Sequence, residues 1–342
     1  FLEVFLSFMI YLYKKMSTFS NNILVTGGAG YIGSHIIELL IKKRIKVFIY
    51  DNLVTGNKRL INKKAIFIKG DIKNSKLLIK TINENNINSI IHLAGYLNIS
   101  EGQKNKKKYY KNNVLGTLNL VKACKNSNVK NIIFSSSCSV YGNINGSVSE
   151  KKIPKPKSYY AFTKYKSEEI IKEYEKKFNF KYGILRYFNV AGASQSGKIG
   201  EIEKSYGHLI KNLAIQSTKL KPKVDIFGNN YNTKDGTCIR DYIHVSDLAN
   251  IHILALKKIS SSKKSLILNC GYGKGYSVKE IVEIFKKIKK GVVVRYRKKR
   301  IGDVAQIYSD NSKLKKILKW KPKFNNIRTI LKSAIKWEKK LT

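Results

Sequence analysis

Tyr160 and Lys164 are the residues whose types and spacing most directly suggest a chemical reaction. They lie four residues apart in a segment of helical pattern, so their side chains share one face of the helix. A neighbouring ammonium favours the phenolate and lowers the pKa of a tyrosine from its ordinary value of about 10. With a second positive charge nearby, Lys164 would make Tyr160 a general base that is usable near neutral pH. A Tyr-x-x-x-Lys pair also occurs by chance on many helix surfaces, so its neighbours decide its meaning.

Three consecutive serines are candidate partners of Tyr160 and Lys164. The apolar segment 130–135, which has the composition of a buried strand, ends in Ser135, Ser136 and Ser137. Parallel sheets bind their ligands at the carboxyl ends of the strands, which is where these hydroxyl groups would lie. A serine hydroxyl there can hydrogen-bond a reacting sugar oxygen and pass its proton toward Tyr160. One of these serines therefore completes a candidate catalytic group.

A glycine-rich turn provides a candidate phosphate site. Gly27, Gly30 and Gly33 lie in TGGAGYIG, between the apolar run 22–26 and a helical segment. Such a turn lets backbone N–H groups and the helix dipole meet a pyrophosphate, although the triplet alone also suits an ordinary strand-to-helix turn. Asp51 follows eighteen residues after Gly33, where its carboxylate can accept from both ribose hydroxyls of an adenosine. Because that carboxylate repels a 2′-phosphate, we expect NAD rather than NADP.

Residues at the ends of the following strands extend this predicted dinucleotide site. Asp71 comes after the third strand and is placed to meet the adenine, and Leu93, Ala94 and Gly95 come after the fourth. Each of these residues, taken singly, is also compatible with a structural role. The other expected cofactor contacts are Tyr31, Ile32, Asn52 and Ile72.

The elements that position these residues alternate between short apolar strands and helices. This pattern predicts the α/β class, with a doubly wound parallel sheet of the Rossmann type and helices on both faces. We expect an NAD-binding domain over 21–190 and a smaller C-terminal substrate lobe over 191–342, with about 240–260 returning to the main domain. Helices are expected at 31–43 and at about 74–85, 106–126 and 159–178, and strands at 22–26, 46–50, 65–69, 89–93, 130–135 and 181–188.

The composition is that of a globular protein, with 342 residues, 43% hydrophobic content and a formal net charge of +45. Such a charge ordinarily suggests nucleic acid or an anionic membrane as a partner, because clustered Lys and Arg neutralise phosphates. Here lysines are spread along almost every segment, so we expect a solvated surface and neither partner. The four cysteines are far apart and lack metal-ligand spacing, which predicts no metal site and a reducing cytoplasm.

The opening stretch, FLEVFLSFMIYLYKK, is apolar for thirteen residues. It is too short to span a bilayer and lacks the basic segment that would precede a signal-peptide core. We expect translation to begin at Met16 and residues 1–20 to be an N-terminal extension that does not belong to the native domains. A membrane anchor is the alternative.

Six ordered blocks of sequence carry a resemblance that covers nearly the whole chain. They are TGGAGYIGSH, FSSSCSVYG, YAFTK, LRYFNVAGA, IFGNNYNTKDGT and RDYIHVSDLA. Together they resemble the extended short-chain dehydrogenase/reductase family, which includes NAD-dependent epimerases and dehydratases, and within it the UDP-glucose 4-epimerases. The resemblance implies that Ser137, Tyr160 and Lys164 are the catalytic residues and that Asn112 and Tyr187 also help to hold NAD.

The same resemblance implies how a nucleotide sugar would be held. The residues that it assigns to the UDP moiety are Asn189, His208, Leu209, Phe227, Arg240, Tyr242, Arg300 and Asp303. Arg240 and Arg300 suit a pyrophosphate through forked, charge-assisted hydrogen bonds. Phe227 suits packing against uracil, and Asp303 suits a ribose hydroxyl.

Two further positions bear on specificity and cofactor retention. Ile307 would border the 2-substituent of the sugar, where family members carry a large aromatic residue that closes the pocket or a small one that admits an N-acetyl group. Leu97 stands where family members often carry a lysine that reaches the cofactor, and this departure concerns how tightly NAD is kept. The resemblance also implies a homodimer through helices near 106–126 and 159–178.

The implied activity is the reversible epimerisation of UDP-glucose and UDP-galactose at C4, through a transient 4-keto sugar. The alternatives are a UDP-N-acetylglucosamine 4-epimerase or another UDP-sugar-modifying short-chain dehydrogenase. A dehydratase usually needs an Asp-Glu pair after the active-site hydroxyl residue, and Cys138 and Ser139 occupy those positions. A non-enzyme alternative is a cofactor-binding scaffold that interacts with RNA, which the net charge would favour.

Overall fold

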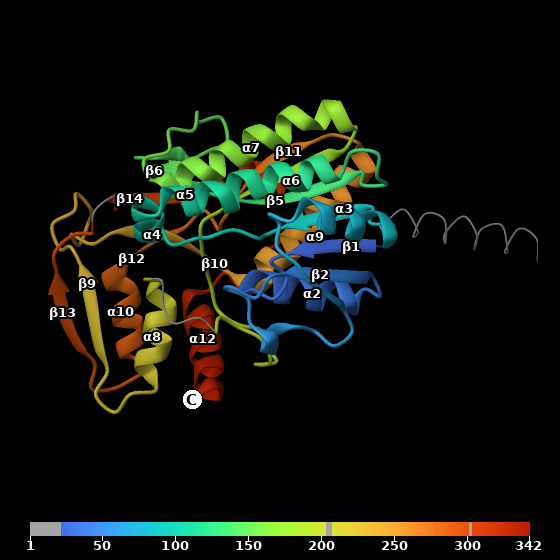
Figure 1. Cartoon of the computed structure of the whole chain (residues 1–342). Coiled ribbons are helices and arrows are strands. Elements are labelled where there is room, and N and C mark those ends of the chain that lie inside the picture. The colour runs from blue at the N-terminus through green and yellow to red at the C-terminus, as the bar shows by residue number, and fades with distance from the viewer. Residues whose placement is uncertain (1–21, 203–206, 301–302) are drawn as a thin grey trace, which may run out of the picture.

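The computed structural model describes residues 22–202, 207–300 and 303–342 (Figure 1). The extension expected over 1–20 lies outside these residues. The main layer is a seven-stranded parallel sheet in the order β11-β7-β5-β4-β1-β2-β3. Its strands are β1 (Asn22–Thr26), β2 (Lys46–Asp51), β3 (Ile66–Lys69), β4 (Ser89–His92), β5 (Asn131–Ser137), β7 (Lys181–Tyr187) and β11 (Leu266–Cys270). The strand order reverses at β1, and doubly wound sheets bind their ligands at such a point.

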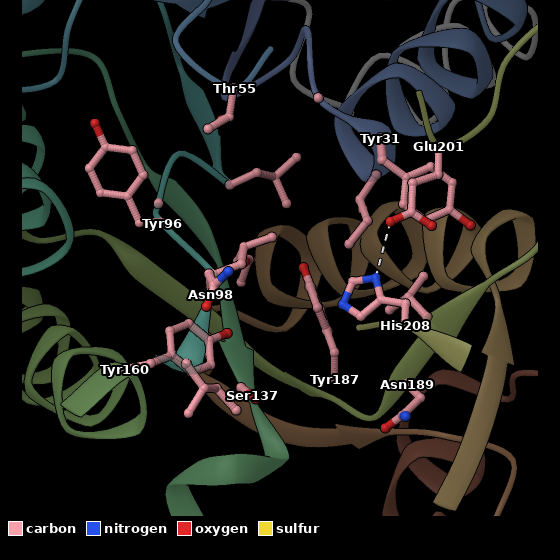
Figure 2. Close-up of a pocket in the computed structure, with 18 of the residues that line it drawn as sticks. Tyr31, Thr55, Tyr96, Asn98, Ser137, Tyr160, Tyr187, Asn189, Glu201 and His208 are labelled. Atoms are coloured by element: carbon pink, nitrogen blue, oxygen red, sulfur yellow. Dashed lines mark hydrogen bonds and ion pairs between the residues drawn. The ribbon is translucent and has the colours of Figure 1, made fainter. Parts of the chain in front are cut away.

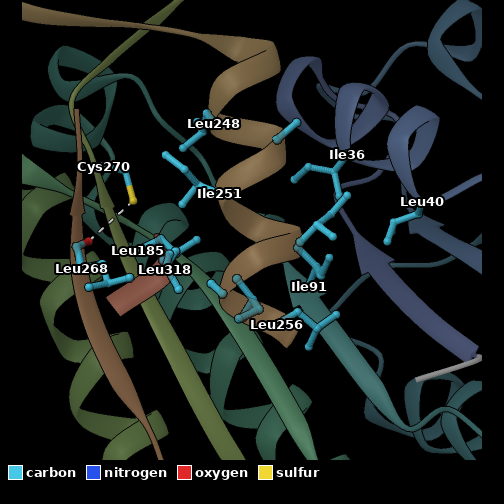
Figure 3. Close-up of a cluster of buried hydrophobic side chains, with 14 of the residues drawn as sticks. Ile36, Leu40, Ile91, Leu185, Leu248, Ile251, Leu256, Leu268, Cys270 and Leu318 are labelled. Atoms are coloured by element: carbon cyan, nitrogen blue, oxygen red, sulfur yellow. Dashed lines mark hydrogen bonds between the residues drawn. The ribbon is translucent and has the colours of Figure 1, made fainter. Parts of the chain in front are cut away.

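Helices cover both faces of this sheet, which confirms the predicted fold class. One face carries α2 (Tyr31–Lys42), α9 (Val245–Ser262) and α11 (Ser312–Leu318), and the other carries α3 (Ser75–Glu84), α6 (Gly116–Ala123) and α7 (Tyr159–Phe178). Figure 3 shows the first face, where Ile36 and Leu40 of α2 share one buried cluster with Leu248 and Leu256 of α9. Burial of these apolar faces fixes the two helices against the strands that end in the site.

A smaller lobe is built around two further sheets and three helices. One sheet has the order β12-β10-β14-β6, with β8 also paired to β10, and the other pairs β13 with β9. The strands are β6 (Asn145–Val148), β8 (Asn189–Ala191), β9 (Lys223–Phe227), β10 (Ile239–His244), β12 (Gly275–Ser277), β13 (Val293–Arg297) and β14 (Gln306–Ser309). The helices α8 (Leu209–Ser217), α10 (Val278–Lys286) and α12 (Ile327–Leu341) enclose the buried cluster of this lobe. After β10, the chain crosses back so that α9 and β11 complete the main layer.

The segment expected as one helix over 106–126 is divided in the structure. It consists of α5 (Lys106–Tyr109), the π-helical segment η2 (Tyr110–Leu115) and α6, and α4 (Ile99–Lys104) precedes it. A π-helical turn accommodates an extra residue and often occurs at functional sites. The remaining short helical turns are η1 (Lys58–Leu60) and η3 (Cys138–Tyr141).

The described residues were searched for membrane-spanning helices and for metal sites. Within 22–202, 207–300 and 303–342, no helix is long and apolar enough to cross a membrane. Across the same ranges, the His, Cys, Asp and Glu side chains form no group of three that could hold a metal ion.

Candidate active site

A cavity of about 870 Å³ lies at the carboxyl ends of the main strands and extends to the smaller lobe (Figure 2). The predicted site residues that line it are Gly27, Gly30, Tyr31, Ile32, Gly33, Asp51, Asn52, Ile72, Leu93, Ala94, Gly95, Asn112, Ser137, Tyr160, Tyr187, Asn189, His208, Leu209, Arg240, Tyr242, Asp303 and Ile307. The predicted residues Asp71, Lys164, Phe227 and Arg300 are not part of this lining. The structure therefore brings most of the predicted cofactor and substrate residues into one cavity.

The glycine turn leaves no room for a side chain at Gly27 or Gly33. Gly27 adopts a φ of +70°, and a Cβ there would lie 2.7 Å from the backbone nitrogen of Ala94. A Cβ on Gly33 would lie 2.6 Å from the carbonyl oxygen of Gly27, so α2 starts in direct contact with the turn. The N-terminus of α2 has no side-chain cap and no acidic residue in its first turn. This arrangement fits a dinucleotide pyrophosphate, which would meet the uncapped N–H groups and the positive end of the helix dipole.

Asp51 is held rigidly beside this turn. Its carboxylate accepts hydrogen bonds from the backbone N–H groups of Ala29, at 3.0 Å, and Leu53, at 2.8 Å. Burial raises the pKa of Asp51, and the two hydrogen bonds oppose that rise. Asn52 faces the cavity and donates to Asp71 at 2.9 Å, so Asp71 contacts the cavity lining without being part of it, and its expected role at the adenine stays a prediction.

We expect NAD to bind at least about tenfold more tightly than NADP, because the fixed carboxylate of Asp51 repels a 2′-phosphate. Asp51→Asn removes the charge but keeps one amide oxygen as an acceptor, so the preference should shrink. A charge-assisted hydrogen bond is worth about 1.5–3 kcal/mol, which corresponds to a loss of about ten- to a hundredfold in NAD affinity. Calorimetric titration of both proteins with both cofactors measures this. An unchanged NAD-to-NADP affinity ratio in the variant would exclude Asp51 as the selective group.

Tyr160 and Ser137 face each other in the cavity (Figure 2). Tyr160 lies in the first turn of α7, whose N-cap is Ser158, and is 8% exposed. Burial raises the pKa of Tyr160 to about 12, and a hydrogen bond from Ser137 opposes that rise. Ser137 Oγ itself accepts from the N–H of Ser139 at 3.2 Å and from its hydroxyl at 2.8 Å. These two donors direct the Ser137 proton away from Ser139, toward Tyr160 or a reacting oxygen.

Lys164 lies behind Tyr160 instead of lining the cavity. Lys164 is 2% exposed, and its ammonium donates to the carbonyl oxygen of Ser135 at 2.8 Å. Burial lowers the pKa of Lys164 to about 8, and the charge of Glu168 opposes this. The sequence predicts that Lys164 helps to lower the pKa of Tyr160, whereas in the structure burial dominates and the Tyr160 pKa rises. The positive charge of a nicotinamide would have to supply the lowering.

Asn113 joins the loop after β4 to α7. Its side-chain oxygen accepts from the backbone N–H of Tyr96 at 2.8 Å and from the amide of Asn112 at 3.0 Å. Its amide donates to the carbonyl of Tyr96 and to the hydroxyl of Thr163, both at 3.1 Å. Asn113 is not among the residues predicted from the sequence, although its place next to the predicted Asn112 is a signal that could have found it.

The substrate side of the cavity already contains paired polar groups. The imidazole Nδ1 of His208 lies 3.0 Å from the carboxylate of Glu201 (Figure 2). Arg240 forms an ion pair with Asp303 at 3.5 Å. These pairs place cationic and anionic groups where the resemblance implies a diphosphate and a ribose.

Phe227 and Arg300 lie next to this region and contact each other. The guanidinium of Arg300 is 4.0 Å from the centre of the Phe227 ring, a cation–π arrangement. Arg300 also donates to the carbonyl of Gly207 at 3.3 Å. Their expected roles toward diphosphate and uracil stay predictions.

Several cavity residues were not predicted from the sequence, because they lie in loops or on helices outside the motifs. They include Thr55, Tyr96, Asn98, Gln103, Lys104, Phe188, Glu201, Lys211 and Trp337. Phe188 could have been found from its place next to Asn189 in the block LRYFNVAGA.

Comparison with known proteins places this geometry in a family. Residues 23–271 match the NAD dependent epimerase/dehydratase family. The chain is 40% identical over 326 residues to UDP-glucose 4-epimerase from Lactobacillus helveticus, covering 93% of this chain and 97% of that protein. The structure of UDP-glucose 4-epimerase from Brucella ovis in complex with NAD matches with a TM-score of 0.87 at 35% identity, covering 92% of this chain and 98% of that one.

A third relative is named for two substrates. The structure of the UDP-Glc/GlcNAc 4-epimerase from Campylobacter jejuni matches with a TM-score of 0.81 at 37% identity, covering 94% of this chain and 99% of that one. The similarity thus extends over almost the full length of each relative. Given this match and a glycine turn that fits the cofactor NAD, the chain belongs to the NAD-dependent epimerase/dehydratase family.

Proposed function

We propose that this chain interconverts UDP-glucose and UDP-galactose by inverting the configuration at C4 of the sugar. The chain is an NAD-dependent UDP-sugar 4-epimerase, and the proposal concerns which sugars it accepts. The observation that supports this proposal most strongly is that Tyr160, Ser137, the glycine turn and the lobe residues all line one cavity. Turnover of purified protein with UDP-galactose, assayed for UDP-glucose, tests it.

The residues of this chain would move one proton and orient one oxygen. Ser137 would hold the 4-oxygen, and Tyr160 would take its proton and return it in the second half of the reaction. NAD, when bound, supplies the hydride acceptor and donor at C4. No net oxidation results, so the protein must keep its cofactor and let the 4-keto sugar turn over between the two steps.

The lobe residues would hold the substrate by its nucleotide. Arg240 would bind the diphosphate, and Asp303 would bind a ribose hydroxyl. The ion pair between these two residues would have to break for this. Binding energy directed to UDP leaves the hexose loosely held, which turnover within the site requires. Phe227 would pack against uracil and Arg300 would bind the diphosphate after the contact between the two side chains opens.

Ile307 is the proposed gate for the sugar 2-substituent. It lines the cavity and is 5% exposed, packed in a buried cluster with Val140, Tyr141 and Phe188. A β-branched side chain in such a cluster has little freedom to swing aside. Since crowding costs about 1–3 kcal/mol, we expect UDP-glucose and UDP-galactose to be preferred over the N-acetylated pair by about ten- to two-hundredfold.

Steady-state kinetics on both substrate pairs measure this preference. Ile307→Ala should reduce it by opening space beside the sugar, and Ile307→Tyr should increase it. The native protein serves as the reference for both. If neither variant changed the ratio of the specificity constants, Ile307 would not be the gate.

The second candidate is a UDP-N-acetylglucosamine 4-epimerase, which the broader specificity named for the Campylobacter jejuni relative favours. Faster turnover of the N-acetylated pair by the native protein would select it. A dehydratase is disfavoured because Cys138 and Ser139 stand where dehydratases usually carry an Asp-Glu pair.

We further propose a cytoplasmic homodimer. Its expected interface, near 106–126 and 159–178, carries the partly exposed Tyr110 and Leu115, at 39% and 38%. The four cysteines are free thiols, which suits a reducing compartment. Light scattering of the purified protein would give the mass of the assembly.

A further inference from the structure

The buried face of α7 carries one acidic residue that the reaction itself does not use. Tyr160, Lys164 and Glu168 follow one another at intervals of four, so they lie along one face of the helix. Glu168 is fully buried, at 0% exposed. Each of the three has a partner among three consecutive serines of β5: Tyr160 with Ser137, Lys164 with Ser135 and Glu168 with Ser136.

The carboxylate of Glu168 joins three elements. Its Oε1 accepts from the hydroxyl of Ser136 at 2.5 Å and from Nε of Arg186 at 2.9 Å. Its Oε2 accepts from Nη2 of Arg186 at 2.6 Å, and Lys172 lies 3.7 Å away at the surface end. Both oxygens are therefore used in a forked pair that fixes α7 to β5 and β7.

Arg186 carries this connection to the wall of the cavity. Its Nη1 donates to the hydroxyl of Tyr141 at 2.9 Å, and Tyr141 donates to Asn269 at 2.7 Å. Tyr141 packs in the same buried cluster as Ile307. A shift of Glu168 would thus reach the helix, the serines and the sugar pocket together.

We propose that Glu168 is a positioning residue, which holds α7 in the register that places Tyr160 against Ser137. The inference rests on the proposed function, because it concerns the same base. Stability alone does not require such a group, since a buried ion pair replaced by well-packed apolar residues is often no less stable. The forked pair between Glu168 and Arg186 fixes the position of α7 relative to β7. This matters for the rate, because a misplacement of about 1 Å at a reacting group can reduce a rate about a hundredfold. The charge of Glu168 also opposes the lowering of the Lys164 pKa by burial.

Two variants and one control test this in the full-length protein saturated with NAD. Glu168→Gln keeps the shape but removes the charge, and Ser136→Ala removes only the link to β5. The control is Asp247→Asn. Asp247 is 1% exposed, and its carboxylate accepts from the backbone N–H of Phe324 and from the hydroxyl of Tyr272. It is not part of the cavity lining. Melting temperature, kcat and the KM for UDP-galactose are measured for each.

We expect Glu168→Gln to lower kcat about 10- to 100-fold with KM changed less than about threefold, and Ser136→Ala to lower kcat by a smaller factor in the same way. Asp247→Asn should lower the melting temperature with kcat unchanged. If Glu168→Gln does not fold, the Ser136→Ala result decides. Native kcat in Ser136→Ala and in any folded Glu168→Gln, or an equal fall of kcat in the control, would overturn the inference. An inactive native protein would instead refute the proposed function.

Discussion

Replacing Tyr160 by phenylalanine should reduce epimerisation at least about a hundredfold, because general acid–base catalysis typically contributes 10²–10⁴-fold. The substitution removes one hydroxyl from a residue that is 8% exposed and otherwise packed in place. The ring still fills its space, so the fold should be retained. UDP binding should also be retained, since the proposed nucleotide contacts lie in the lobe.

Single-turnover and steady-state assays of Tyr160→Phe with UDP-galactose check this expectation. Calorimetric titration with UDP and a melting curve serve as controls for binding and folding. Ser137→Ala is the matched comparison, and it should lose less activity because the hydroxyl of Ser137 orients the oxygen without taking the proton. Turnover of Tyr160→Phe near the native rate would show that another group is the base.

Gly33→Ala should abolish productive NAD binding. A Cβ at this position would lie 2.6 Å from the carbonyl oxygen of Gly27 and 2.7 Å from Cα of Gly28, and both are backbone atoms that cannot rotate aside. The start of α2 must therefore move away from the turn that would cradle the pyrophosphate. Overpacking of this kind costs about 1–3 kcal/mol of stability. We expect NAD affinity to fall about a hundredfold or more, because a displacement near 1 Å misaligns the N–H groups.

Gly30→Ala is the control for this prediction. A Cβ on Gly30 meets only the Gly27 carbonyl oxygen, at 3.2 Å, so the fold should hold while the approach to a pyrophosphate narrows. Melting curves and NAD titrations separate the two variants, since only Gly33→Ala should lose stability. Native stability and native NAD affinity in Gly33→Ala would contradict the close packing described for the turn.

The sequence predicts six of the seven strands of the main layer, and it misses β11, which follows the segment of about 240–260 that was expected to return to this layer. Short β-branched runs and helical periodicity determine which segments lie in the sheet, and residues that follow parallel strands must meet at one edge. Asp51 and Ser137 were found in this way. The lobe was less predictable, because its strands are short and pair across long separations, as β14 does with β6.

The contacts of individual side chains could not be predicted in the same way. Lys164 shares a helix face with Tyr160, yet its ammonium bonds the carbonyl of Ser135. Glu168 has the sequence environment of an exposed helical residue, and only the approach of Arg186 from β7 makes its burial possible. Such pairings depend on tertiary contacts between elements that no local pattern records.

The fate of a deuterium label at C4 shows whether the hydrogen that leaves this carbon returns to it. Purified protein with NAD is incubated in ordinary water with UDP-galactose that carries deuterium at C4, and the UDP-sugar product is analysed by mass spectrometry and NMR. We expect UDP-glucose that keeps its deuterium at C4, because the hydride that leaves this carbon returns to it and only the hydroxyl proton passes through Tyr160. Loss of the label to solvent, or no formation of UDP-glucose, would contradict this expectation.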